Sequence, residues 1–415
     1  MNLKNLKFFI VIIPFISSLC HADLETTSVL PQDVYSPKLM FGRYSGLGDR
    51  YNSIGLVQGV ADQYHLALSG PTLAKLDSRL KTLIDSLNNF SSTERFGDEL
   101  SLGTLNIKSA PVVDYFAPTI SYGITPDFSF GIGIPLIHFH NEIEVVAGGQ
   151  SNVEQLRDHT QNTSPQLTQA FDQLIALTHN MPGTLQTVLA ARGYKQIQTQ
   201  DYTALGDLQI SGLYNYYSSD HWSLAIRPFV QLPTGRKDDP DDLADAPTGG
   251  QPALGVYSIH EYRASPRVNL VSSLGYVANI PDETQMRVPN GVDDILPGPE
   301  RKTTVSRRTG NSLLMEGGVR YFLNHSIEFG TYYGIMQKDP DVFSGGKGWD
   351  YSILSIDTSA TTHQIKFNLE FSSVSWYQAK SFSLPLQMGI IYGNTFLAVN
   401  SPYQTSNQVY LRMFF

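Results

Sequence analysis

The densest cluster of side chains able to do chemistry is acidic. The stretch "RKDDPDDLADAP" at 236–247 contains Asp238, Asp239, Asp241, Asp242 and Asp245. Closely spaced carboxylates suit Ca²⁺, a hard cation that takes oxygen ligands. The spacing lacks the glycine and the distal glutamate of an EF-hand loop, and runs of like charge are commonly solvated. We therefore expect a solvated charged loop that holds no metal ion.

A second candidate is the histidine pair His138 and His140 in "HFH". Residues two apart lie on one side of a strand, where two imidazoles could form half of a metal site, but no third ligand lies nearby in the sequence. The P-loop, the Rossmann fingerprint, H-E-x-x-H and G-x-S-x-G are all absent. We expect no metal, no cofactor and no catalytic residues, and a protein that is not an enzyme. A site assembled from separate strands would escape this search.

The N-terminus indicates export. Lys4 and Lys7 precede the apolar run "FFIVIIPFISSL", and small residues follow in "CHA". This pattern is typical of a secretory signal peptide, 1–22, cut after Ala22, with a lipid anchor at Cys20 as the alternative. Cys20 is the only cysteine, so the processed chain has none for a disulfide. The net charge of -9 becomes -9 - 2 = -11 when two lysines leave, which disfavours a nucleic-acid partner.

The remaining sequence alternates rather than forming long apolar runs. Charged residues make up 16%, below the usual quarter. In "QIKFNLEFSS" Ile365, Phe367 and Leu369 fall on one face, with Lys366 and Asn368 on the other. An exported chain without a spanning helix crosses lipid only as a closed β-barrel, whose strands alternate in this way.

We predict about twelve antiparallel strands, with fourteen as the alternative. They run near 99–108, 112–124, 128–143, 204–217, 221–234, 252–264, 267–280, 311–323, 325–337, 360–375, 379–396 and 404–415. Short links at 125–127, 218–220, 264–266 and 323–325 alternate with long connections at 144–203, 235–251, 281–310 and 338–359. Gram-negative outer-membrane barrels have short periplasmic turns and long external loops. The fold class is therefore all-β, a transmembrane antiparallel β-barrel over 99–415 in the cell outer membrane.

The last strand ends in an aromatic pair. In "QVYLRMFF" Val409, Leu411, Met413 and Phe415 share one face. Aromatic rings are favoured at the membrane interface. A C-terminal Phe also resembles the signal that the barrel-assembly machinery recognises. We expect Phe415 to be this assembly signal, and outer-membrane lipid and the assembly machinery to be partners.

The alternation also predicts which polar side chains face the lumen. They are Arg227, Gln231, Glu261, Arg263, Arg267, Asn269, Arg320, Glu328, Lys366, Glu370 and Arg412. Both signs of charge occur, so these side chains either brace and fill the barrel or line a water-filled pore whose selectivity they set. About twelve strands predict a narrow lumen, open or occluded.

Two segments have helical periodicity. From Pro71, leucines recur at helical spacing and predict an amphipathic helix over 71–90. We expect 23–98 to form an N-terminal plug or periplasmic segment, its helix packed on the barrel's periplasmic end or inside its mouth, or else lying on the membrane surface. The insert 144–203 has helical stretches at 167–178 and 184–192. It is expected outside the cell, as a lid or pore constriction or as a flexible covering.

Two strands carry a family resemblance. In "LGDLQISGLYNYY" Gly206 and Asp207 open one strand, and in "LAIRPFVQLPTGRKDD" the next strand closes with Leu232, Pro233, Thr234 and Gly235. In these motifs, and in "KLMFGRYSGLGDRYN", the chain resembles a large family of outer-membrane transporters named after the meta-cleavage pathway of phenol degradation. The resemblance implies a barrel that takes up small aromatic or other hydrophobic compounds, although the long insert departs from compact members.

These features predict a channel or transporter for passive uptake of small-molecule solutes, among them hydrophobic or aromatic ones. Solutes would diffuse through a lumen filtered by its charges and by the inserted loop. One alternative is a barrel enzyme acting on lipid or peptide, which needs a clustered set of Ser, His or Asp side chains. Another is a structural or adhesive barrel with a blocked lumen.

Overall fold

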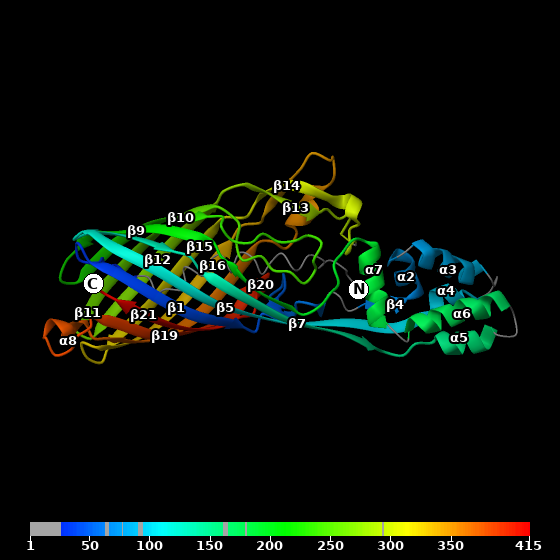
Figure 1. The fold of residues 1–415 in the computed structure, drawn as a ribbon, viewed down its shortest axis with the longest axis horizontal. Helices are drawn as coiled ribbons and strands as arrows, with labels where there is room; N and C mark the ends of the chain where they lie inside the picture. Colours follow the sequence, from blue (N-terminus) through cyan, green and yellow to red (C-terminus); the bar gives the residue numbers. More distant parts are fainter. Residues whose placement is uncertain are drawn as a thin grey trace.

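The computed structural model describes residues 26–62, 66–76, 78–89, 94–160, 165–178, 181–292 and 294–415, so the expected signal peptide lies outside the described part. Twelve strands form an antiparallel barrel, which closes because β1 pairs with both β21 and β5. Figure 1 shows this barrel with a helical lobe beyond one end. The twelve-stranded all-β prediction is confirmed. The ring strands are β1 (Tyr35–Ser45), β5 (Ser101–Thr125), β6 (Phe128–Gly133), β9 (Leu208–Ser218), β10 (Trp222–Leu232), β11 (Ala253–Ser265), β12 (Val268–Asn279), β15 (Ser312–Phe322), β16 (Ile327–Lys338), β18 (Ala360–Ser372), β19 (Leu386–Val399) and β21 (Thr405–Met413).

Two positions of the ring are built from two strands placed end to end. β7 (Leu136–Gly148) follows β6 along the edge of β5, and β8 (Gln200–Leu205) pairs with β7 before β9 begins. The two joins touch, because the Gly206 amide donates to the Pro135 carbonyl at 2.7 Å. A Cβ on Gly206 would lie 2.6 Å from the Pro135 ring, so this join requires glycine.

The helices gather where β5 and β7 extend beyond the barrel (Figure 1). They are α2 (Gly70–Leu76), α3 (Ser78–Asn89), α4 (Phe96–Glu99), α5 (Val153–Thr160), α6 (Pro165–Thr178) and α7 (Met181–Ala191), with β4 (Leu66–Ser69) paired to β5. Ile84, Leu87, Phe96, Phe171 and Leu174 are buried in their shared core. Among the described residues no helix is long and apolar enough to cross a membrane.

The two ends of the barrel differ. The short-turn end has the tight links after β5, β9, β11 and β15, the helix α8 (Val374–Gln378) and the C-terminus. The long-loop end has two small sheets, β13 (Asp282–Arg287) with β14 (Lys302–Arg308) and β17 (Val342–Ser344), and β20 (Ser401–Pro402) with β2 (Asp49–Tyr51) and β3 (Val57–Gly59). Two 3-10 turns, η4 (Pro299–Arg301) and η5 (Tyr351–Ser355), lie in its loops.

The start of the barrel differs from the prediction. The segments 99–108 and 112–124 are one strand, β5, because Pro111 removes only one ladder donor while both sides of it pair with β7. Merging these two segments leaves eleven predicted strands. The twelfth strand of the ring is β1, which lies in the segment 23–98 that we expected to be a plug or periplasmic segment. Pro37 and Gly42 interrupt its apolar pattern and hide it.

Two further boundaries were wrong. The strand expected over 379–396 begins only at Leu386, since α8 and an irregular stretch precede it. The helix expected over 71–90 is two helices, α2 and α3, which pack with α5 and α6 beyond the long-loop end rather than on the end with short turns. The insert's apolar helical faces cover those of α2 and α3, which explains this placement.

The outer wall carries an apolar surface that ends within one row of residues toward the long-loop end. On β10 the outward side chains Trp222, Ile226, Val230 and Leu232 are exposed, as the alternation predicted. Toward the long-loop end, a register row of Phe41, Phe116, Leu136 and Leu205 crosses β1, β5, β7 and β8. The next outward row is Arg43, Asp114, His138 and Thr203. This change from apolar to charged is typical of the boundary of a lipid-facing band.

Candidate functional site

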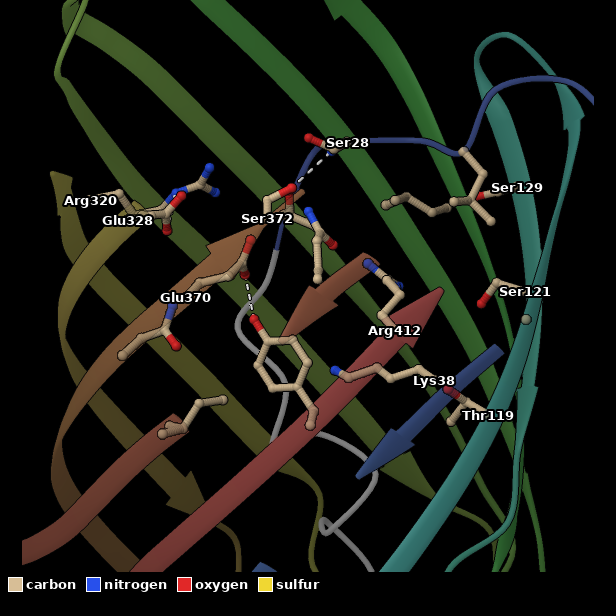
Figure 2. Close-up of a pocket in the computed structure, with 18 of the residues that line it drawn as sticks. Ser28, Lys38, Thr119, Ser121, Ser129, Arg320, Glu328, Glu370, Ser372 and Arg412 are labelled. Carbon is tan, nitrogen blue, oxygen red and sulfur yellow. Dashed lines mark hydrogen bonds and ion pairs between the residues drawn. The ribbon is translucent and has the colours of Figure 1, made fainter. Parts of the chain in front are cut away.

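A cavity of about 390 Å³ lies in the barrel lumen near the short-turn end. Side chains of ten ring strands line it, together with the turn residues Asn324 and His325. Figure 2 shows Lys38, Arg320 and Arg412 among the side chains that surround the space. The lining is mostly polar, as expected for the inner face of strands whose outer face is apolar.

The cavity lining holds more cationic than anionic groups. Two carboxylates line it, Glu328 and Glu370, against four cations, Lys38, Arg227, Arg320 and Arg412. The buried carboxylate of Glu261 lies behind Arg320. Counting Glu261, four cations face three carboxylates in a chain whose overall charge is -9.

Arg320 neutralises two of the three carboxylates. Its guanidinium lies 3.3 Å from Glu261 and 3.0 Å from Glu328, measured from nitrogen to oxygen. On the same inner wall, the Lys366 ammonium lies 2.7 Å from Glu316. Arg320–Glu328 joins the neighbouring strands β15 and β16, and the other two pairs each reach across one intervening strand, which corresponds to the bracing interpretation of the lumen charges.

Tyr410 separates the acidic side of the cavity from its basic side. Its hydroxyl donates a hydrogen bond to Glu370. The ammonium of Lys38 lies 4.4 Å from the centre of its ring, which is a cation–π distance. Lys38 is in register with Arg412 on the neighbouring strand, so two cations share one row of the wall.

The described N-terminal residues enter the lumen at this end. Thr26 Oγ1 and the Thr27 amide donate to Glu261 Oε1 at 3.1 and 3.0 Å, and Asn215 Nδ2 donates to the Thr27 carbonyl at 3.0 Å. Thr26, Ser28 and Leu30 line the cavity. The segment therefore narrows the lumen and is anchored on strands β9 and β11.

Side chains fill the lumen above the cavity. Met40, Tyr115, Ile137 and Phe139 are buried in one cluster with Tyr410 and Ile391, which also line the cavity. Ala246 belongs to the same cluster, although it comes from the loop between β10 and β11. This loop, 233–252, therefore folds inward and packs on the wall; its residues 244–250 are buried. The loop and these wall side chains therefore narrow the lumen above the cavity.

Asp207 clamps the base of the inward-folded loop. Its carboxylate accepts hydrogen bonds from the amides of Gly235, at 2.8 Å, and Gly250, at 2.7 Å, and from Gln231 Nε2, at 2.9 Å. Thr234 Oγ1 donates to the Gly206 carbonyl at 2.8 Å. The residues that carry the family resemblance thus lie together, and they hold the loop to the join between β8 and β9.

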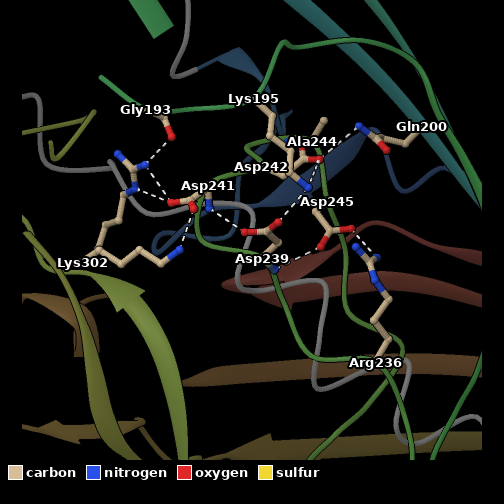
Figure 3. A network of polar contacts seen from close by, with 11 residues as sticks. Gly193, Lys195, Gln200, Arg236, Asp239, Asp241, Asp242, Ala244, Asp245 and Lys302 are labelled. Carbon is tan, nitrogen blue, oxygen red and sulfur yellow. Dashed lines mark hydrogen bonds and ion pairs between the residues drawn. The ribbon is translucent and has the colours of Figure 1, made fainter. Parts of the chain in front are cut away.

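The acidic stretch of this loop is paired rather than solvated, which corrects the sequence expectation. The Asp241 carboxylate lies 2.7 Å from the Arg287 guanidinium and 2.6 Å from the Lys302 ammonium. Figure 3 shows Asp241 beside Lys302, and Asp245 beside Arg236. The cause is mainly tertiary, because Arg287 and Lys302 come from β13 and β14, outside this loop. Among the described residues, no cluster of three or more His, Cys, Asp or Glu side chains could hold a metal ion.

The pKa values in this loop move in opposite directions. Burial raises the pKa of Asp238 to about 7, and the nearby charges of Asp245 and Asp239 add to the shift. The hydrogen bonds from Lys302 and Arg287 outweigh burial and lower the pKa of Asp241. One carboxyl of the loop therefore titrates near neutral pH.

Arg287 joins the loop to the long insert. Its guanidinium donates to the carbonyls of Arg192 and Gly193, at 2.7 and 2.6 Å, and lies 3.8 Å from the centre of the Tyr194 ring. Burial raises the pKa of Tyr194 to about 12. The end of the insert 144–203 is therefore fastened to the inward-folded loop.

The predicted lumen residues fall into three groups. The cavity brings together Arg227, Arg320, Glu328, Glu370 and Arg412, with Glu261 beside them. Gln231 and Lys366 lie on the inner wall outside the cavity, and Asn269 is in register with Arg320. Arg263 and Arg267 are exposed at the short-turn end, because β11 ends and turns there.

Lys38 and Tyr410 are two cavity residues that the sequence did not lead us to predict. Lys38 lay in a segment not read as a strand, but its alternation with Leu39 and Phe41, which point outward, was an available signal. The alternation of the last strand places Tyr410 inside the barrel. It does not indicate that the ring contacts Lys38 or that the hydroxyl bonds to Glu370.

The histidine pair lies on the outer face, above the apolar surface. His140 Nδ1 is 3.0 Å from Asp201 Oδ2, and His138 Nδ1 is 3.1 Å from Thr203 Oγ1. Each hydrogen bond occupies the Nδ1 atom of its ring, and the partners are Thr203 and Asp201 on β8.

A set of Ser and His side chains also lies on the outer face. Ser258 Oγ is 2.8 Å from His260 Nε2, and Ser272 Oγ is 3.4 Å from His260 Nδ1. The alternating neighbours Tyr257 and Ile259 are buried inside, so these polar groups point outward. The set resembles a nucleophile, a base and an orienting group, with a hydroxyl in place of the usual carboxylate.

No protein-family model and no curated protein sequence matches this chain. Its fold is similar to the crystal structure of an outer-membrane channel from Pseudomonas putida F1, with a TM-score of 0.53, 10% identity and coverage of 95% of this chain and 100% of that chain. The toluene transporter TodX of Pseudomonas putida has a TM-score of 0.33 and 10% identity, and the match covers 96% of this chain and 92% of that chain. A FadL homologue of Pseudomonas aeruginosa has a TM-score of 0.31 and 9% identity, and the match covers 94% of this chain and 95% of that chain.

Proposed function

We propose that this protein is an outer-membrane channel for passive uptake of small-molecule solutes. The observation that carries the proposal is a closed barrel with an apolar outside and a charged cavity inside, above which an inward-folded loop packs on the wall. The fold of the Pseudomonas putida F1 channel supports it. The motif of Gly206, Asp207 and Leu232–Gly235 supports membership in the phenol-pathway transporter family, because those residues together hold the loop.

The membrane contacts follow from the same proposal. The outward apolar side chains would contact outer-membrane lipid, and Phe415, 65% exposed and hydrogen-bonded through its backbone to Tyr35, would be read by the barrel-assembly machinery. Neither a cofactor nor a catalytic residue is needed for diffusion.

Planar bilayers test the channel directly. The purified full chain is expected to give stepwise conductance, and replacing 237–247 by a short Gly-Ser linker should raise it, because this removes the inward-folded segment. A wild-type protein and a linker variant that both stay silent, while migrating as folded barrels, would contradict the proposal.

The outward Ser258–His260–Ser272 set favours one second candidate, a hydrolase acting on lipid esters. Ser258 would attack the ester carbonyl while His260 takes its proton, and His260 would return that proton to the alcohol that leaves as the ester C–O bond breaks; water would then hydrolyse the acyl-serine and release the acid. A fluorophosphonate reagent should then label the wild type but not Ser258→Ala or His260→Gln. Equal labelling of all three would remove this candidate.

A further inference from the structure

We infer that the lumen cavity is a binding site for small anions, with carboxylates as the ligand class, held at Lys38 and Arg412. This inference rests on the proposed channel function and names its solute class. The resemblance implies hydrophobic solutes, whereas the cavity presents charge.

The carboxylates of the cavity already have donors. Glu261 and Glu328 share Arg320, Glu261 also accepts from Thr26 and Thr27, and Glu370 accepts from Tyr410. Their charges are therefore directed toward protein groups rather than toward a solute.

Arg412, on the opposite wall, is placed differently. The Arg412 Nε atom is buried and has no hydrogen-bond partner among the described residues. Figure 2 shows Arg412 and Lys38 side by side, reaching toward the open part of the cavity from β21 and β1. Two cations in one register row repel each other, and a shared anion would relieve that repulsion.

The geometry suits a carboxylate. A guanidinium presents paired N–H donors that match two carboxylate oxygens, and an ammonium beside it adds a point charge. Ser121 and Thr119 hydroxyls line the same side of the cavity and supply neutral donors. A volume of about 390 Å³ accommodates a small organic acid.

Binding and selectivity are measured separately. Sodium benzoate serves as the anionic ligand and benzyl alcohol as its neutral analogue, titrated calorimetrically into the purified full chain in detergent. Ion selectivity is read from the reversal potential in a potassium chloride gradient across a bilayer. We expect benzoate to bind more tightly than benzyl alcohol, and chloride to pass more readily than potassium.

The variant Lys38→Gln/Arg412→Gln should weaken benzoate binding by about tenfold or more and abolish the chloride preference, since both cations are lost. The variant Lys38→Arg/Arg412→Lys keeps both charges and should keep the preference. Lys380→Gln, which removes an exposed cation after α8 at the same end, is the matched control and should change neither quantity. Heat-modifiable migration on gels shows that each variant is folded.

The two failures are distinguishable. Equal binding of benzoate and benzyl alcohol, or benzoate binding that survives in folded Lys38→Gln/Arg412→Gln, overturns the anion site whatever the conductance. Benzoate binding that depends on both cations in a barrel that never conducts supports the anion site and contradicts the channel.

Discussion

The carboxylate of Asp207 accepts the amide hydrogen of Gly250 at 2.7 Å, although 43 positions separate the two residues. The same oxygen accepts from Gly235 at 2.8 Å. One side chain at a join in the barrel wall therefore holds both ends of the loop that fills the lumen. The inward position of the loop therefore depends on a side chain of the barrel wall as well as on the loop's own residues.

Removing the Asp207 carboxylate should loosen the loop. Asp207→Ala leaves the amides of Gly235 and Gly250 without their acceptor, at a cost of about 1–3 kcal/mol for each buried group. The loop should open more often, so trypsin should cut faster after Arg236 and Lys237, and bilayer current should rise.

Asp207→Asn is the matched control, because one amide oxygen can still accept from both glycines. It should behave more like the wild type. Unchanged cleavage in Asp207→Ala would show that the clamp does not hold the loop.

Loop closure should depend on pH through Asp238. Its pKa is about 7 in the closed structure, while in a released loop it would return toward about 3.9. Between these values the closed form binds the proton more tightly, so closure weakens as the pH rises from about 4 to about 7 and then levels off. Current through the channel should be larger at pH 7.5 than at pH 4.5.

Asp238→Asn should remove this dependence, because the amide does not titrate. A current that falls between pH 4.5 and 7.5, or an equal rise in Asp238→Asn, would count against the assignment.

Arg287 should be essential for the cap at the long-loop end. Its side chain is 4% exposed, and Arg287→Ala would leave the carbonyls of Arg192 and Gly193 without this donor and Asp241 with Lys302 alone. Loss of one partner of a buried pair typically costs about 3–5 kcal/mol. The loop and the insert should become protease-sensitive together, while the barrel keeps its heat-modifiable migration.

Arg287→Lys retains the charge but not the planar set of donors, so it should fall between Arg287→Ala and the wild type. Protease sensitivity confined to the insert would mean that Arg287 does not join the two segments.

Glu261 should hold the N-terminal segment in the lumen. Glu261→Ala removes the acceptor of Thr26 and Thr27, which should expose residue 27, 2% exposed in the structure, to solvent more often. With Thr27→Cys in a Cys20→Ser background, a membrane-impermeant thiol reagent should react about tenfold faster in Glu261→Ala, the effect of losing roughly 1.4 kcal/mol.

Glu283→Ala removes an exposed carboxylate at the other end of the barrel and serves as control. If both substitutions leave the labelling rate at the wild-type value, the segment is held by other contacts.

Much of the barrel could be predicted because its signal is local. A side-chain period of two places Trp222, Ile226 and Val230 outside and Arg227 inside without knowledge of any partner strand. Pro37 and Gly42 weaken this signal in β1, and Pro111 imitates a turn inside β5. Strands interrupted in this way are recognised only from their pairing.

An export signal, the inner and outer faces and the alternation of short and long connections could all be predicted from the sequence, since each depends on residues close together in the chain. That β1 closes the ring, that Asp207 clamps an inward-folded loop and that Lys38 lies in register with Arg412 became evident only from the folded barrel. Those contacts join segments tens to hundreds of positions apart, and the closure of the barrel, rather than any local preference, brings them within hydrogen-bonding reach.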